Sequence, residues 1–223
     1  MRRLFELGGM VAAAVLIALG ITTIVMGMNG RSTVQNSLKQ EYIVGSSDMT
    51  PSAIAAQAKE AKLPASIKLP TCNVADKPID TGPEARCFAE YMRIHTLEST
   101  GGYTYSQMGR FQAKPGAPAS QLAKGGGTDN AKWAAIDPKT QQPVSNGARN
   151  LWVTETALTT ALNASYMADQ ISLFGLMVGI TLLLSGFGFG ILAVGGALRT
   201  EKSLRDLFSF RRKHVRKTPV PTA

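Results

Sequence analysis

Charged residues are missing from two long stretches of the chain, although they make up 17% of the 223-residue sequence. Residues 7–28 and 171–198 contain no Asp, Glu, Lys, Arg or His. An uncharged apolar run of at least ~18 residues is typical of a transmembrane helix, since about 20 helical residues cross a ~30 Å hydrocarbon layer. This absence of charge excludes an ordinary soluble globular protein. It also argues against a channel or transporter, whose pathways usually carry ionisable side chains within the membrane.

Histidine and cysteine are scarce, with two of each, and the motifs of several enzyme classes are missing. His95 lies between the two apolar runs and His214 follows the second, so a bilayer would separate them. One chain therefore cannot form a metal site of two histidines and a carboxylate, nor a zinc site of several His and Cys ligands. No Gly-x-Ser-x-Gly elbow accompanies His95, and the glycine triplet at 125–127 lacks the Gly-Lys-Ser/Thr ending of a phosphate loop. We expect no enzymatic activity, no cofactor and no metal.

The distribution of basic residues predicts which segments face the cytoplasm. The net charge is +9, and most of it comes from residues 199–223. Basic residues close to a span favour the cytoplasmic side, whereas long loops are translocated largely regardless of charge. We therefore expect residues 1–6 and 199–223 in the cytoplasm and residues 29–170 outside the plasma membrane. The alternative is a cleaved signal peptide, but the apolar run is long for one and no A-x-A-like site follows it.

The tail at 199–223 interleaves basic and apolar residues. Cations just inside a span attract anionic lipid head groups, by about 1 kcal/mol each near the surface. The simpler interpretation is that they only fix the orientation of the span. We expect no nucleic-acid partner, because the tail has no fold that would present it to one. Its basic residues are Arg199, Lys202, Arg205, Arg211, Arg212, Lys213, Arg216 and Lys217.

The two cysteines, Cys72 and Cys87, both lie in the segment predicted to be external. Thiols in an oxidising compartment usually form a structural disulfide. A redox-active pair would need a Cys-x-x-Cys spacing or a depressed thiol pKa, and this spacing is too wide. We therefore predict a structural disulfide between them.

Small residues recur in both apolar runs, and in the second run they are four residues apart. Such spacing lets helix backbones approach closely in lipid, where packing replaces the hydrophobic drive. Either the two spans pack against each other as an antiparallel pair, or they dock onto a partner protein or a second copy. The candidate packing residues are Gly175, Gly179, Gly186 and Gly190.

The segment between the runs has several helix signals. Apolar residues repeat every four positions over 32–42, which predicts a helix that continues the first span. Thr50-Pro51 predicts an N-cap for a helix over 52–63, and Thr81-x-x-Glu84 is a capping box that opens a helix over 84–99. Residues 148–170 contain no helix breaker and lead into the second span. The Gly- and Pro-rich residues 113–150 predict a flexible loop.

Aromatic residues of this segment could line a binding groove. Packing in the core of a small external domain is the alternative, because such a domain has little other apolar area to bury. The residues concerned are Tyr103, Tyr105, Phe111, Trp133 and Trp152.

Three stretches carry a resemblance to a known group of proteins: residues 36–46, 86–95 and 152–158. Through them the chain resembles an uncharacterised family of two-span actinobacterial membrane proteins, over most of its length. Some members of that family are labelled aromatic ring-opening dioxygenases. That label would imply a metal site with two histidines and a carboxylate, which His95 and His214 cannot supply together.

The sequence therefore predicts an all-α membrane protein: two transmembrane helices flank a mainly helical external domain with one disulfide and a long flexible loop. We expect a non-enzymatic protein of the cell envelope whose external domain binds or organises a partner, either another membrane or envelope protein or further copies of itself. The alternative is a sensor or regulatory subunit that transmits external binding to the basic cytoplasmic tail.

Overall fold

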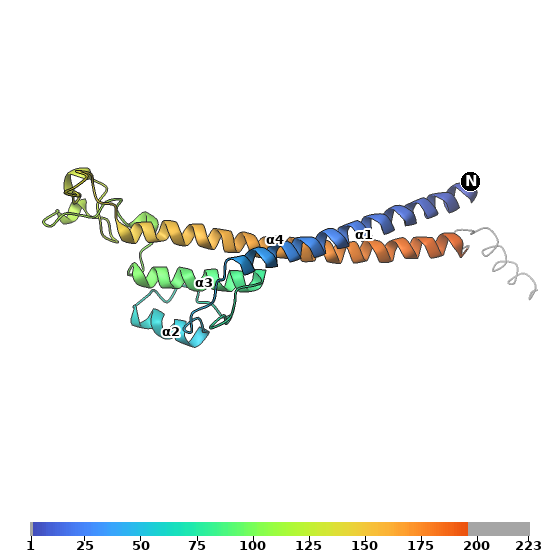
Figure 1. Cartoon of the computed structure of the whole chain (residues 1–223), viewed down its shortest axis with the longest axis horizontal. Coiled ribbons are helices and arrows are strands. Elements are labelled where there is room, and N and C mark those ends of the chain that lie inside the picture. The colour runs from blue at the N-terminus through green and yellow to red at the C-terminus, as the bar shows by residue number, and fades with distance from the viewer. Residues whose placement is uncertain (1, 196–223) are drawn as a thin grey trace, which may run out of the picture. The chain divides into compact units, whose positions relative to one another are not determined.

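The computed structural model describes residues 2–195 of the chain (Figure 1). The chain divides into two compact units. The apolar unit comprises the described parts of residues 1–28 and 173–223, and the polar unit is Asn29–Ser172. The predicted basic tail at 199–223 lies outside the described residues, as does His214. Residues 2–195 contain four α-helices and three short 3₁₀ helices, and the only β pairing among them is in isolated bridges. The α-helices are α1 (Arg2–Gln40), α2 (Pro51–Glu60), α3 (Gly82–Ser99) and α4 (Gly147–Val194), and the 3₁₀ helices are η1 (Tyr105–Gln107), η2 (Ala119–Gln121) and η3 (Ala131–Trp133).

Helices α1 and α4 are long and apolar enough to cross a membrane. Each is unbroken, with 39 and 48 residues respectively, so each contributes to both units. Helix α1 continues beyond its apolar run, as the spacing of apolar residues over 32–42 predicts, and ends at Gln40. Helix α4 begins at Gly147, one residue before the predicted start. Both helices thus extend well past the ~20 residues that a bilayer requires.

In the apolar unit α1 and α4 pack closely as an antiparallel pair. A Cβ atom placed on Gly179 would lie 2.9 Å from the Gly20 carbonyl oxygen, and one on Gly186 would lie 3.1 Å from that of Ala13. Contacts therefore move toward the start of α1 as they move toward the end of α4. All four predicted packing glycines face α1, although Gly175 and Gly190 approach it less closely than the other two. The structure thus contains the intramolecular packing that was one of the two alternatives.

The polar unit is built around α3. Thr81 caps this helix: its Oγ1 accepts a hydrogen bond from the Glu84 backbone N–H, and Glu84 Oε2 accepts one from the Thr81 N–H at 3.0 Å. These two bonds are the predicted capping box. Helix α3 runs antiparallel to the first half of α4, since Gly82 lies against Asp169 and Arg93 lies over Trp152 (Figure 1).

The core of the polar unit draws on all four α-helices. Ile54, Tyr91 and Ile94 are almost completely buried. The hydroxyl of Tyr91 donates a hydrogen bond to the Cys72 carbonyl oxygen at 2.7 Å. The buried residues of this core are Leu38, Met49, Ile54, Val74, Ile79, Ala85, Cys87, Phe88, Ala89, Tyr91, Ile94, Leu97, Met108, Trp152 and Leu162.

The predicted disulfide joins Cys72 to Cys87, with a Cα–Cα distance of 6.1 Å. It ties the irregular segment after α2 to the second turn of α3, and Cys87 itself is buried in the core. The cross-link and the Tyr91 hydrogen bond hold the same stretch of chain, so this segment is fixed against α3 at two neighbouring points.

The segment predicted to be a flexible loop, 113–150, is irregular but not structureless. Its backbone pairs over long range: Gln112 N–H donates to the Val144 carbonyl and Ala135 N–H donates to the Gln112 carbonyl, both at 2.8 Å. Asn146 Nδ2 donates to the Gly109 carbonyl at 2.9 Å. Gly and Pro content predicted that the segment is irregular. It did not predict these hydrogen bonds, because their partners are far apart in sequence. Flexibility of the segment stays a prediction.

Candidate binding groove

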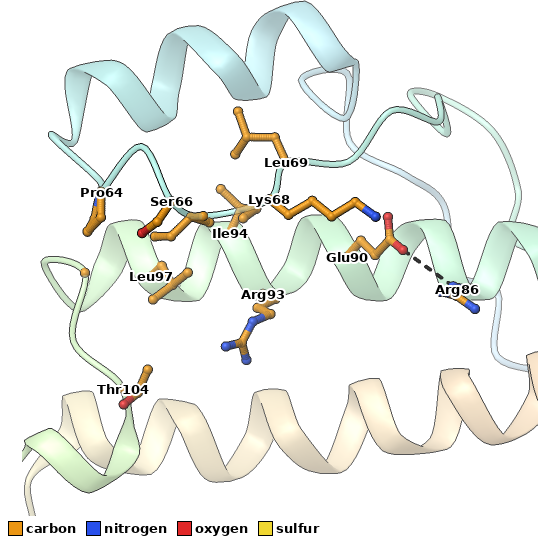
Figure 2. A pocket seen from close by; sticks show the side chains of 12 residues that line it. Pro64, Ser66, Lys68, Leu69, Arg86, Glu90, Arg93, Ile94, Leu97 and Thr104 are labelled. Atoms are coloured by element: carbon orange, nitrogen blue, oxygen red, sulfur yellow. Dashed lines mark hydrogen bonds and ion pairs between the residues drawn. The ribbon is translucent and has the colours of Figure 1, made fainter.

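A groove of about 610 Å³ crosses the exposed side of α3 in the polar unit (Figure 2). Helix α3 supplies its floor through Arg86, Glu90, Arg93, Ile94 and Leu97. These positions are three or four residues apart, so their side chains share one helix face.

Two irregular segments border this floor. The first, residues 64–69, follows α2 and is turned by a hydrogen bond from the Ile67 N–H to the Pro64 carbonyl at 3.0 Å. The second includes Gly102 and Thr104 and leaves the end of α3 through two glycines with positive φ, Gly101 at 62° and Gly102 at 82°. Those backbone conformations suit glycine, which lacks the Cβ that would clash. The groove is thus formed by chain turns on both sides of a regular helix.

The charge of the groove is predominantly positive. Arg86 Nε lies 3.5 Å from Glu90 Oε1, so these two charges compensate each other. Lys68 and Arg93 form no ion pair with any residue in the described part of the chain. Lys68, Arg93 and Glu90 are all exposed to solvent. The groove therefore carries two cations in excess, which favours an anionic ligand.

Two arginines of the groove, Arg86 and Arg93, make cation–π contacts with aromatic rings of α4. The Arg86 guanidinium carbon lies 4.8 Å from the centre of the Tyr166 ring, and that of Arg93 lies 5.4 Å from the Trp152 ring. Trp152 is itself fixed, because it is 3% exposed and its indole N–H donates to the Tyr103 carbonyl at 2.9 Å. Cation–π contact of this kind restricts a guanidinium without neutralising it. Arg93 is thereby held in place with its charge available.

A second polar cluster surrounds His95 on the same helix. His95 Nδ1 lies 3.2 Å from Glu98 Oε2, and Nε2 lies 3.8 Å from Asp48 Oδ2. Hydrogen bonds from the Ser46 hydroxyl and the Gln57 amide lower the pKa of Asp48 below its ordinary value of 3.8. The two carboxylates approach different ring nitrogens. Within residues 2–195 no group of three or more His, Cys, Asp and Glu side chains is arranged to hold a metal ion.

The predicted functional residues are only partly brought together in the structure. Of the aromatic residues proposed for a groove or a core, Trp152 is buried, whereas Tyr103 and Tyr105 are exposed. The groove cations Lys68, Arg86 and Arg93 were not predicted. The sequence signal for the last two is their spacing with Glu90 on one face of α3, but Lys68 and the α4 aromatics join them only through tertiary folding.

Comparisons with protein-family models, with curated proteins and with solved structures found no match to this chain.

Proposed function

We propose that the chain is a two-pass membrane protein that holds its polar unit outside the cytoplasm, and that this unit binds a partner or ligand rather than catalysing a reaction. The observation that carries the binding function is the groove on α3 with two uncompensated cations, Lys68 and Arg93. These two cations lie beside the apolar residues Ile94 and Leu97, so the groove combines apolar lining with a few charged groups. Such an arrangement is typical of a binding site.

The external location of the polar unit is supported by three features. The helices α1 and α4 have the length and composition of membrane spans. The Cys72–Cys87 disulfide is of the kind that persists in an oxidising compartment and is rare in the cytosol. The positive charge of the tail at 199–223 favours the same orientation.

Site-specific photocrosslinking in intact cells tests this function. A photoreactive residue at Ser66, inside the groove, is compared with one at Lys139, an exposed position outside it. We expect a defined adduct only from Ser66, and we expect Lys68→Glu with Arg93→Glu to abolish it because they reverse the charge of the groove. Recovery of the chain without an adduct from either position would contradict the proposal.

A sensor or regulatory subunit is the second candidate, and the unbroken course of α1 and α4 favours it. A continuous helix is a rigid element that can transmit a displacement along its length. In this role the basic tail at 199–223 would receive the signal and act on a cytoplasmic target. Neutralising Arg211, Arg212 and Lys213 should then abolish function while insertion into the membrane is retained.

A further inference from the structure

We propose that the α3 groove binds a small anionic amphiphile: one phosphate or carboxylate group attached to a short apolar body. The inference deepens the proposed binding function by naming the chemical class of the ligand. It needs only the groove itself and does not depend on which side of a membrane the polar unit occupies.

The head group of the ligand is specified by the cations. Arginine presents a planar fork of N–H donors that matches the oxygens of a carboxylate or phosphate, and such charge-assisted hydrogen bonds are among the strongest in proteins. The guanidinium of Arg93 contacts the Trp152 ring and forms no ion pair with a carboxylate of the described residues. Lys68 extends over the same face of α3 on the side of Glu90 (Figure 2). An anion in the groove would replace the carboxylate partner that these cations lack.

The body of the ligand is specified by the rest of the lining. Ile94 and Leu97 are buried residues of α3 that reach the floor of the groove, and Ile67 and Leu69 are half-buried in the opposite wall. In Figure 2, Pro64 and Leu97 lie toward one end of the groove, and Arg86 and Glu90 lie toward the other. Charge is thus concentrated toward one end of the groove, and the other end combines Pro64 and Leu97 with the uncharged polar residues Ser66 and Thr104, which suits a ligand that is charged at one end only.

Size and geometry favour a small molecule over a protein segment. The volume of about 610 Å³ lies within the ~300–1,000 Å³ range of small-molecule sites. One common mode of peptide binding adds a strand to a free sheet edge, and residues 2–195 form no strand beyond isolated bridges. The walls are short chain turns, which do not provide the long apolar track that an amphipathic helix occupies.

Binding of hexyl phosphate to the full chain in nanodiscs of zwitterionic phosphatidylcholine tests the proposal. A Trp133→Phe background leaves Trp152, which contacts Arg93, as the only tryptophan of the chain, and its fluorescence, corrected for that of empty nanodiscs, reports binding. We expect saturable binding of hexyl phosphate, and binding at least roughly 10-fold weaker for hexanol and for inorganic phosphate, because each lacks half of the contacts. Hexanoate in a parallel titration separates carboxylate from phosphate recognition.

Matched variants assign the binding to the groove. Arg93→Gln should weaken hexyl phosphate binding roughly 10-fold, whereas Lys124→Gln, an exposed cation outside the groove, should leave it unchanged. Lys68→Gln should weaken it as well and provides a second variant, since exposed Lys68 forms no ion pair in the described part of the fold. Empty nanodiscs correct for partition of the probe into lipid.

Failure of this inference differs from failure of the proposed function. Absence of saturable binding by folded protein, equal binding by Arg93→Gln and Lys124→Gln, or equally tight binding of inorganic phosphate alone would overturn the amphiphile proposal. A Ser66 photoadduct with a protein in that same situation would leave the proposed function intact and assign the groove to a polypeptide partner. Absence of any Ser66 photoadduct in cells, together with saturable binding of hexyl phosphate, would contradict the proposed function in the cell and leave the chemical specificity of the groove intact.

Discussion

At the residue scale, the polar unit contains carboxylates whose polar contacts link separate elements. Asp48 accepts hydrogen bonds from the Ser46 hydroxyl and from the Gln57 side chain of α2, and it lies near His95 of α3. Arg31 of α1 pairs with the buried carboxylate of Asp169 on α4, at 3.4 Å. Each of these carboxylates therefore connects residues from different parts of the chain.

The hydrogen bonds of Asp48 predict a loss of stability in acid. The pKa of Asp48 is lower in the folded protein than its ordinary value of 3.8, so the ionised carboxylate stabilises the fold above that value. The contribution disappears as pH falls through the folded pKa. Asp48→Asn should lower the unfolding temperature by about 2–4 °C near neutral pH and reduce its dependence on pH below about 4. Circular dichroism of the full chain at a series of pH values measures both effects.

Asp76→Asn is the matched control for this substitution. Asp76 is exposed, and its side chain has no hydrogen bond or ion pair among the described residues. Its variant should keep the acid transition of the original chain. An identical change of slope in both variants would show that the effect comes from overall charge and not from the Asp48 contacts.

At the scale of elements, the disulfide links two segments of the polar unit, and the packed helices α1 and α4 form the apolar unit. Local sequence signals were sufficient for several of these features. Thr81 and Glu84 predicted the start of α3 because a capping box involves only residues within one turn. The cysteine pairing was predicted because the chain has only two cysteines, both in the segment between the apolar runs. The order of residues 113–150 and the groove depended instead on contacts between distant segments, such as Arg93 with Trp152, which no local pattern reveals.

Removing the disulfide should destabilise the polar unit. The cross-link closes a loop with a sequence separation of 15 residues, and a loop of that size contributes about 3 kcal/mol by restricting the unfolded chain. Cys72→Ser with Cys87→Ser should therefore lower the unfolding temperature by about 6–12 °C. The original chain, not reduced, should take up no thiol reagent. Quantitative labelling of both cysteines, or an unchanged unfolding temperature in the double variant, would count against the disulfide.

An engineered disulfide tests the packing of α1 against α4. A Cβ on Gly190 would lie 3.8 Å from the Ala13 Cβ, which matches the usual ~3.8 Å separation in disulfides. Ala13→Cys with Gly190→Cys should therefore oxidise within one chain, as seen by mass spectrometry. Ala13→Cys with Gly188→Cys is the control, because a Cβ on Gly188 meets nothing within 4 Å. Cross-linking between two chains in place of the internal bond would instead support docking of the glycines onto a second copy.

At the scale of the whole molecule, composition gave more information than any motif. The two uncharged runs correspond to the apolar parts of α1 and α4, the only helices among the described residues that could cross a membrane. The scarcity of His and Cys limited the chemistry that could be expected, but it did not identify a ligand. The groove adds that information through its charge, because Lys68 and Arg93 lack carboxylate partners within the described fold. The proposed function therefore depends on the two uncharged runs, which indicate the membrane, and on the groove cations, which indicate an anionic ligand.

The proposed two-pass topology is tested most directly by a dual-tag accessibility assay. One epitope is inserted at Gly116, a turn where a Cβ would meet nothing within 4 Å, and a second follows Ala223. In intact cells whose wall has been removed, we predict that antibody reaches the Gly116 epitope and reaches the Ala223 epitope only after permeabilisation. Protection of the Gly116 epitope, or exposure of Ala223 before permeabilisation, would contradict the account.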